Sequence, residues 1–262
     1  MVETRHCLVS TILCIFAFMQ NNKFHIVIVG AGNVGTQLAK LFDGKVDELT
    51  LCRHSDANIP VDADLYLICV SDTALEEVVA MLPRFNGVVA HTSGTMSKEL
   101  LSKFPKHGVF YPFQSFRREI ELQNPIFPIL IEASDTESER LLRLSAELIT
   151  DYVVLTDEAG RRQLHVAGVF ASNFTNLMYD AAFEVVGSRF NPEQILMPLL
   201  RETLDRLKMG LPENFQTGPA IRNDRAVIES HLEWLRSKPE LQKIYKDLSQ
   251  ILLKKYGHEE LP

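Results

Sequence analysis

The most constraining feature of this chain is a change of pattern within residues 24–39, which read FHIVIVGAGNVGTQLA. A nearly all-apolar run is followed by three glycines, Gly30, Gly32 and Gly35, and then by a helical pattern. Glycines at this spacing between a strand and a helix allow a pyrophosphate to approach the backbone, and the N–H groups of the helix N-terminus face the anion. The pattern predicts a dinucleotide site. The alternative is a glycine turn that binds nothing.

The end of the second expected strand, residues 48–53, indicates which dinucleotide is bound. Enzymes that use NAD usually carry Asp or Glu at this position, whereas this chain has Arg53 followed by His54. A guanidinium binds a 2′-phosphate through two hydrogen bonds, so the sequence favours NADP(H); the alternative is a solvated surface arginine. The residues predicted to contact the cofactor, including those that end the third and fourth strands, are Gly30, Ala31, Gly32, Asn33, Val34, Gly35, Arg53, His54, Val70, Ser71, Asp72 and Thr92.

The first half of the chain alternates short β-rich runs with segments of helical length. This alternation is typical of an α/β fold with a doubly wound, mostly parallel sheet. Prolines in two of the strand-like runs predict that these strands lie near an edge or depart from regular pairing. The expected strands are residues 24–29, 48–53, 63–70, 87–94, 107–116, 125–133 and 151–156.

The second half has no strand signal beyond about residue 157. Residues 161–186 contain no proline and place small and apolar side chains on one face, which predicts one long helix. Three more amphipathic helices are expected within residues 191–210, 225–235 and 239–257. The predicted organisation is an extra N-terminal segment (residues 1–22), a dinucleotide-binding domain (23–155) and an all-helical domain (156–262).

Composition excludes several classes of function. The chain has 262 residues, 27 basic and 34 acidic, with a formal net charge of −7, so nucleic acid is not an expected partner. Its four cysteines have neither C-x-x-C spacing nor a nearby histidine cluster, so no metal site is expected. Cys52 and Cys69 lie in apolar strand-like runs, which indicates reduced core thiols in a cytoplasmic protein.

Residues 8–19 form an apolar run of twelve that is too short to span a bilayer. A signal-peptide core of this length is conceivable, but no small-x-small cleavage site follows it. We favour a third interpretation, in which translation begins at Met19, because the sequence from there would open a nucleotide-binding domain directly. No membrane association is expected.

Three motifs occur in the order GVFYPFQSF, LHVAGVFASNFTNLMY and QTGPAIRND. In this order they resemble Rossmann-like proteins with a DUF2520 helical domain, a group provisionally named NADP oxidoreductases. The amino half is also similar to the NADP-binding domain of F420-dependent NADP reductases, pyrroline-5-carboxylate reductases, ketopantoate reductases and β-hydroxyacid dehydrogenases. The resemblance runs from about Lys23 to the carboxyl end. It implies a Rossmann-type domain followed by a helical domain, as in 6-phosphogluconate-dehydrogenase-like proteins, with a cleft between them and a homodimer formed through the helical part.

One residue departs from those relatives. β-Hydroxyacid dehydrogenases and ketopantoate reductases carry Lys-x-x-x-Asn on the long helix, but here Val169 stands four residues before Asn173. His165 and Ser172 share one face of the expected helix, so His165 is the candidate general acid; a core histidine that binds a carbonyl is the alternative. The candidate catalytic residues are His165, Asn173 and Ser93, and the candidate substrate contacts are Gln114, Ser115, Ser172 and Arg222.

Two of these candidates have a structural alternative of their own. Ser93 fits a turn or a helix cap as well as a ligand contact. Arg222 fits a carboxylate clamp, but it also fits an ion pair with Asp224 or a role in the turn.

The sequence thus predicts an NADP(H)-dependent oxidoreductase that transfers a hydride to or from a small C=O or C=N substrate. The missing lysine keeps a second hypothesis open, in which the protein binds NADP(H) as a metabolite sensor without catalysis. A third is that the glycine loop binds nothing.

Overall fold

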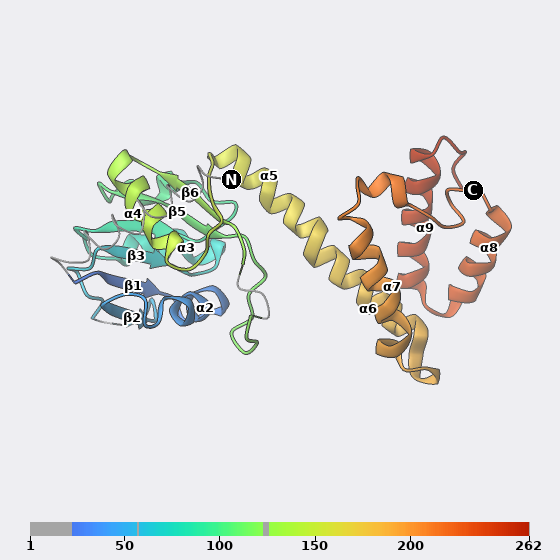
Figure 1. Ribbon diagram of the computed structural model, residues 1–262, viewed down its shortest axis with the longest axis horizontal. Helices are drawn as coiled ribbons and strands as arrows, with labels where there is room; N and C mark the ends of the chain where they lie inside the picture. Colours follow the sequence, from blue (N-terminus) through green and yellow to red (C-terminus); the bar gives the residue numbers. More distant parts are fainter. Residues whose placement is uncertain (1–22, 57, 123–125, 262) are drawn as a thin grey trace. The chain divides into compact units, whose positions relative to one another are not determined.

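The computed structural model describes residues 23–56, 58–122 and 126–261, so the predictions for residues 1–22 lie outside the described residues. The chain divides into two compact units (Figure 1). Unit 1 ends at Asn173 and unit 2 begins at Phe174. This division falls inside a helical run; the domain boundary expected after residue 155 stays a prediction.

Unit 1 is built on a seven-stranded sheet with the order β2-β1-β3-β4-β5-β6-β7. All neighbouring strands are parallel except the pair β5 and β6. The mostly parallel sheet expected from the sequence is confirmed. The strands are β1 (His25–Val29), β2 (Glu48–Cys52), β3 (Leu65–Ile68), β4 (Val88–His91), β5 (His107–Pro112), β6 (Ile129–Ala133) and β7 (Val153–Leu155).

Helices cover both faces of this sheet, as its fully buried central strands require. One face packs against α2 (Asn33–Phe42) and α4 (Thr136–Glu147), and the other against α3 (Asp72–Met81) and the short 3₁₀ helix η1 (Lys98–Leu101). The two layers form one continuous α/β sandwich around the strands. The connections from β1 into α2 and from β3 into α3 begin at the carboxyl edge of the parallel strands.

The proline-containing strands β5 and β6 are both interior strands of the sheet. β6 lies beside the terminal strand β7, near an edge as expected, whereas β5 is the third strand from that end. Its proline, Pro112, is the last residue of the strand, and Pro128 comes just before β6, so neither interrupts a ladder. The expected departure from regular pairing corresponds to the antiparallel β5–β6 pair.

The predicted single helix over residues 161–186 is helical throughout but not uniform. α5 (Glu158–Gly168) passes into a π-helical segment (Val169–Phe174), which passes into α6 (Thr175–Val186). A π turn holds more residues than an α turn, so the angular spacing calculated for an ideal α-helix does not hold across it. His165 and Ser172 lie on either side of the start of this segment.

Unit 2 consists of α6, α7 (Pro192–Arg206), α8 (Arg225–Trp234) and α9 (Pro239–Lys255), with short 3₁₀ turns between them. Its small core joins the segment before α8, α8 itself, α9 and the carboxyl end. None of the described residues of α6 and α7 is buried. In the part of the chain that the structure describes, no helix has the length and apolar character needed to cross a bilayer.

Candidate functional site

The three glycines of the first βα connection have two different structural roles. Gly30 has φ +116°, and a Cβ there would clash with the carbonyl group of Cys69. A Cβ on Gly35 would clash with the carbonyl of Gly30. Gly32 differs, because a Cβ there would meet nothing within 4 Å. Two glycines are therefore required by the fold, and the third borders free space.

That free space lies at the N-terminus of α2. Gly32 is the N-cap residue, and no side chain caps the helix. Asn33 and Val34 begin the helix, and Ala31 is half-buried before it. Uncapped N–H groups at a helix N-terminus attract an anion. The loop thus has the free donors and the room that a pyrophosphate needs.

The loop also lies at the switch point of the sheet. β1 lies between β2 and β3, so the chain leaves β1 toward one side and later crosses to the other. Val70, Ser71 and Asp72 follow β3 at this same carboxyl edge, with Asp72 as the first residue of α3. The Asp72 carboxylate accepts a 2.5 Å hydrogen bond from the Thr95 hydroxyl, which ties the start of α3 to the loop after β4.

Arg53 directly follows β2 and is exposed. Its backbone N–H donates to the Asp56 carboxylate over 2.7 Å, which fixes the turn, and His54 beside it is also exposed. Among the described residues, no carboxylate forms an ion pair with the Arg53 guanidinium. The side chain is therefore available to an anionic group at this edge.

The loop after β4 is held by a buried neutral histidine. His91 is 0% exposed; its Nδ1 accepts from the Ser93 N–H over 3.2 Å, and its Nε2 lies 3.2 Å from the Ser97 carbonyl oxygen. Burial lowers the His91 pKa to about 4, with the nearby Arg161 charge acting in the same direction. His91 is therefore a structural residue that fixes the loop in its neutral form.

Ser93 and Thr92 also serve this loop. The Ser93 hydroxyl accepts from the backbone N–H groups of Thr95 and Met96, so it caps a turn. The Thr92 hydroxyl donates to the Ile68 carbonyl over 3.4 Å. The catalytic role predicted for Ser93 and the cofactor contact predicted for Thr92 stay predictions, and the hydrogen bonds that the structure shows are structural.

His165 is hydrogen-bonded to Tyr111, a residue that was not among the candidates from the sequence. Its Nδ1 lies 2.9 Å from the phenolic oxygen of Tyr111, the penultimate residue of β5. Gly94 lies against both rings, because a Cβ there would lie 2.5 Å from His165 Nδ1 and 2.9 Å from Tyr111 Cζ. Tyr111 is half-buried at this position.

The candidate substrate contacts divide between the two units. The Ser115 and Ser172 hydroxyl oxygens lie 3.0 Å apart, and the Gln114 side chain accepts from the Ser115 N–H. Asn173 is exposed at the end of unit 1. Arg222 is exposed in unit 2, where Asp224 caps α8 by accepting from the Val227 N–H. The roles predicted for these residues stay predictions.

A buried ion pair connects the start of α5 to the sheet and to the loop after β4. Arg161, in the first turn of α5, is 0% exposed and pairs with Glu132 of β6, which also pairs with Lys98. The Arg161 guanidinium also donates to the Met96 carbonyl over 2.5 Å, so it holds the loop after β4 against α5. No sequence pattern marks Arg161 as buried, because an arginine in an amphipathic helix is expected to be solvated.

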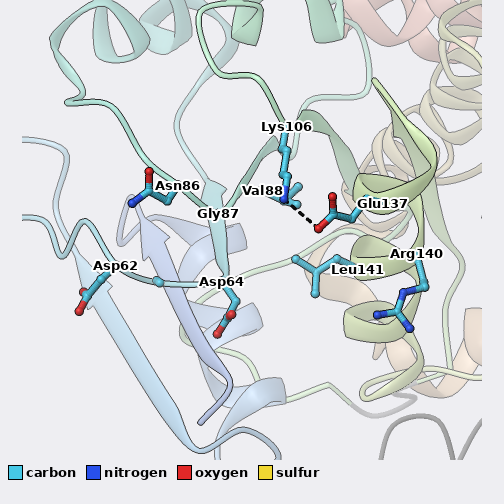
Figure 2. Close-up of a pocket in the computed structure, with 10 residues that line it drawn as sticks. Asp62, Asp64, Asn86, Gly87, Val88, Lys106, Glu137, Arg140 and Leu141 are labelled. Atoms are coloured by element: carbon cyan, nitrogen blue, oxygen red, sulfur yellow. Dashed lines mark hydrogen bonds and ion pairs between the residues drawn. The ribbon is translucent and has the colours of Figure 1, made fainter. Parts of the chain in front are cut away.

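A surface pocket of about 300 Å³ lies at the other edge of the sheet (Figure 2). Its walls come from the residues before β3 and β4, from Lys106 before β5 and from the first turns of α4. These are the amino ends of parallel strands, whereas the glycine loop lies at their carboxyl ends. The Lys106–Glu137 ion pair, with its atoms 2.8 Å apart, forms part of the wall. We therefore do not assign the candidate site to this pocket.

Comparison with known proteins identifies the family. Residues 127–251 match the model of the domain of unknown function DUF2520. The crystal structure of BF3122 from Bacteroides fragilis, provisionally named an NADP oxidoreductase, matches with a TM-score of 0.80 and 32% identity over 88% of this chain and 98% of that one. The chain belongs to the DUF2520 family. The resemblance seen in the three sequence motifs is confirmed.

Two more distant structures share the fold of this DUF2520 protein. Protein TM1727 from Thermotoga maritima matches with a TM-score of 0.61 and 19% identity, over 88% of this chain and 98% of that one. A reductive aminase from Aspergillus terreus, solved with NADPH and ethyl-5-oxohexanoate, matches with a TM-score of 0.66 and 14% identity, over 91% and 97%. No curated protein matches the chain significantly.

Proposed function

We propose that this DUF2520 protein is an NADP(H)-dependent oxidoreductase that transfers a hydride to or from a small molecule with a C=O or C=N group. The observation that carries the proposal is the free space at Gly32, beside the uncapped N-terminus of α2 at the switch point of the sheet. The related Bacteroides protein carries the name of an NADP oxidoreductase, which supports the same activity here.

Each part of the cofactor has a candidate group in unit 1. The α2 N-terminus and residues 30–35 would bind the pyrophosphate, and the Arg53 guanidinium would bind the 2′-phosphate. Bound NADPH supplies the hydride. His165 would manage the proton, with Asn173 as the candidate in the same unit for holding substrate. Arg222 of unit 2 stays a separate candidate for binding a substrate carboxylate. Because Val169 stands where related enzymes carry the proton-donating lysine, another group of this chain would have to transfer the proton.

Binding of the nucleotide is the first test. Titration of the purified protein should give tighter binding for NADPH than for NADH, and Arg53→Ala should weaken NADPH binding at least 10-fold while changing NADH binding little. Arg84→Ala is the matched control, since Arg84 is exposed on the segment before β4, at the amino edge. Equal affinities for the two nucleotides in the unchanged protein would contradict the role of Arg53.

Catalysis separates this proposal from a metabolite sensor. Steady oxidation of NADPH in the presence of small carbonyl compounds or imines is expected of an oxidoreductase. Tight NADPH binding without turnover of any such compound would favour a sensor that keeps the cofactor site but lacks the chemistry.

The homodimer and the cytoplasmic location belong to the same proposal. In unit 2, several apolar side chains of α6 and α7 are exposed, among them Leu177, Leu199 and Leu204. Exposed apolar side chains on two helices without buried residues favour an interface with another protein, and a second copy is the partner that the family resemblance implies. Cys52 and Cys69 are buried free thiols, which fits a reducing compartment.

A further inference from the structure

Tyr111 and His165 form a contact that brings three chain segments together at the carboxyl edge of the sheet. Tyr111 is the penultimate residue of β5, His165 lies in the last turn of α5, and Gly94 of the loop after β4 lies against both rings. The phenolic oxygen and Nδ1 are 2.9 Å apart, with ring centroids 5.9 Å apart and planes tilted by 56°. A side chain at Gly94 would collide with both rings, so the absence of one at this position lets the two rings meet.

The hydrogen bond allows two arrangements of the proton. If the Tyr111 O–H donates to Nδ1, the phenolic hydrogen is committed to His165. If Nδ1 carries the hydrogen and donates to the phenolic oxygen, the O–H of Tyr111 is available to a second acceptor. Only the second arrangement lets Tyr111 protonate a bound molecule.

The phenol lies on the side of the candidate cofactor site. The Asp72 carboxylate, at the first residue of α3, is close enough to raise the Tyr111 pKa, although burial of the ring is the larger cause. Both effects keep the phenol protonated and ready to donate near neutral pH. Asp72 comes after Val70 and Ser71 in the short connection from β3 to α3, and both of these residues are predicted to contact the cofactor.

We propose that Tyr111 and His165 form a proton relay for the reduction of a carbonyl group, in which the Tyr111 phenol protonates the substrate oxygen and His165 returns a proton to Tyr111. This inference rests on the proposed function. As hydride reaches the carbonyl carbon, the C=O π pair moves to oxygen and takes the phenolic hydrogen. Nδ1 gives its hydrogen to the phenolate while Nε2 takes from solvent the one proton that the reduction consumes, so the imidazole stays neutral and no hydroxide is left.

The chemistry of the surrounding groups favours an aldehyde or ketone over an iminium ion. A developing alkoxide needs hydrogen-bond donors, and a phenol supplies one. The Asp72 carboxylate, whose charge raises the Tyr111 pKa, already accepts the Thr95 hydroxyl. The group that the Tyr111–His165 pair itself offers to a substrate is therefore a hydrogen-bond donor.

The first test needs no cofactor. Two-bond ¹H–¹⁵N NMR spectra of the histidine rings in the full-length protein report which nitrogen of His165 carries the hydrogen. We expect the Nδ1–H form in the unchanged protein and a shift toward Nε2–H in Tyr111→Phe. A His165 ring found in the Nε2–H form in the unchanged protein would overturn the relay.

The second test uses NADPH with benzaldehyde, cyclohexanone and pyruvate as carbonyl probes and 1-pyrroline as an imine probe. Tyr111→Phe should bind NADPH within about 2-fold of the unchanged protein, yet reduce a carbonyl probe at least 10²-fold more slowly. His165→Ala should lose less, and added imidazole should restore part of its rate. Tyr152→Phe is the control, because that tyrosine is exposed and 56% of its surface is accessible.

The outcomes separate this inference from the function on which it rests. If the unchanged protein does not bind NADPH, the proposed function fails and the relay fails with it. If NADPH binds and Tyr111→Phe keeps its full rate, the relay alone is overturned. Reduction of 1-pyrroline without reduction of any carbonyl probe would overturn the substrate class.

Discussion

Arg161 and Glu132 form an ion pair with both side chains buried: Nη1 lies 3.1 Å from Oε2, and the side chains are 0% and 8% exposed. Burial lowers the Arg161 pKa from its usual range, while the Glu132 charge opposes this. The pair joins the first turn of α5 to β6. Through the Met96 carbonyl it also joins α5 to the loop that contacts His165 and Tyr111.

Loss of one partner should leave a buried charge without compensation. We expect Glu132→Gln to lower the free energy of unfolding by roughly 3–5 kcal/mol, as is usual when one partner of a buried pair is removed. Urea unfolding followed by circular dichroism measures the change. Glu137→Gln is the control, because the Lys106–Glu137 pair is largely exposed and such pairs contribute about 0–1 kcal/mol. Equal losses in the two variants would contradict the importance of burial.

Substitutions at two glycines of the first βα connection should affect stability and NADPH binding differently. Gly35→Ala places a methyl group against the Gly30 carbonyl, so we expect a loss of about 1–3 kcal/mol in the free energy of unfolding. Gly32→Ala enters free space, so the fold should keep most of its stability while NADPH affinity falls at least 10-fold. Urea unfolding and a fluorescence titration test both variants. Unchanged NADPH affinity in Gly32→Ala would contradict the proposal that this loop binds the pyrophosphate.

His91 should make stability depend on pH. Its pKa is about 4 in the folded protein and near 6.5 in the unfolded chain, so the unfolded state binds more protons between these values. The free energy of unfolding should therefore rise with pH across this window, and about 3 kcal/mol should be lost as pH falls from 6.5 to 4.

The measurement is urea unfolding at several pH values, compared between the unchanged protein and His91→Gln. The variant should lack this part of the pH dependence. Asp135, whose pKa is lowered to about 2 mainly by the Ser138 hydroxyl, loses its contribution only as pH falls from about 3.8 to 2. Parallel pH profiles for the two proteins in the upper window would contradict the role of His91.

The sequence predicted the sheet and the glycine loop because both are encoded locally. Residues 24–39 contain a strand, a turn and a helix start, and their order alone fixes the connection. The antiparallel β5–β6 pair and the interior place of β5 depend instead on contacts between distant residues. Proline did not reveal the place of β5, because Pro112 is the last residue of a strand that has neighbours on both sides.

The candidate site was only partly predictable for a similar reason. His165 became a candidate because it shares a helix face with Ser172, whereas no sequence pattern pointed to its hydrogen-bond partner Tyr111. The π-helical segment changes the register between His165 and Ser172, and side-chain periodicity does not distinguish one extra residue in a turn. Arg161 looked like a surface residue, since burial of a guanidinium depends on a carboxylate supplied by β6.

The apolar surface of unit 2 should determine the oligomeric state. Leu199 and Leu204 of α7 are 63% and 53% exposed, and no described residue of that helix is buried. If a second copy covers this helix, Leu199→Lys with Leu204→Lys should convert a dimer to a monomer in sedimentation velocity, because each buried lysine would have to leave water without a partner. Arg201→Ala on the same helix is the control, and it should leave the dimer intact. The unchanged protein should be measured over a range of concentrations up to about 100 μM, which is above the Kd of most stable dimers. A monomer at every concentration in this range would contradict the homodimer.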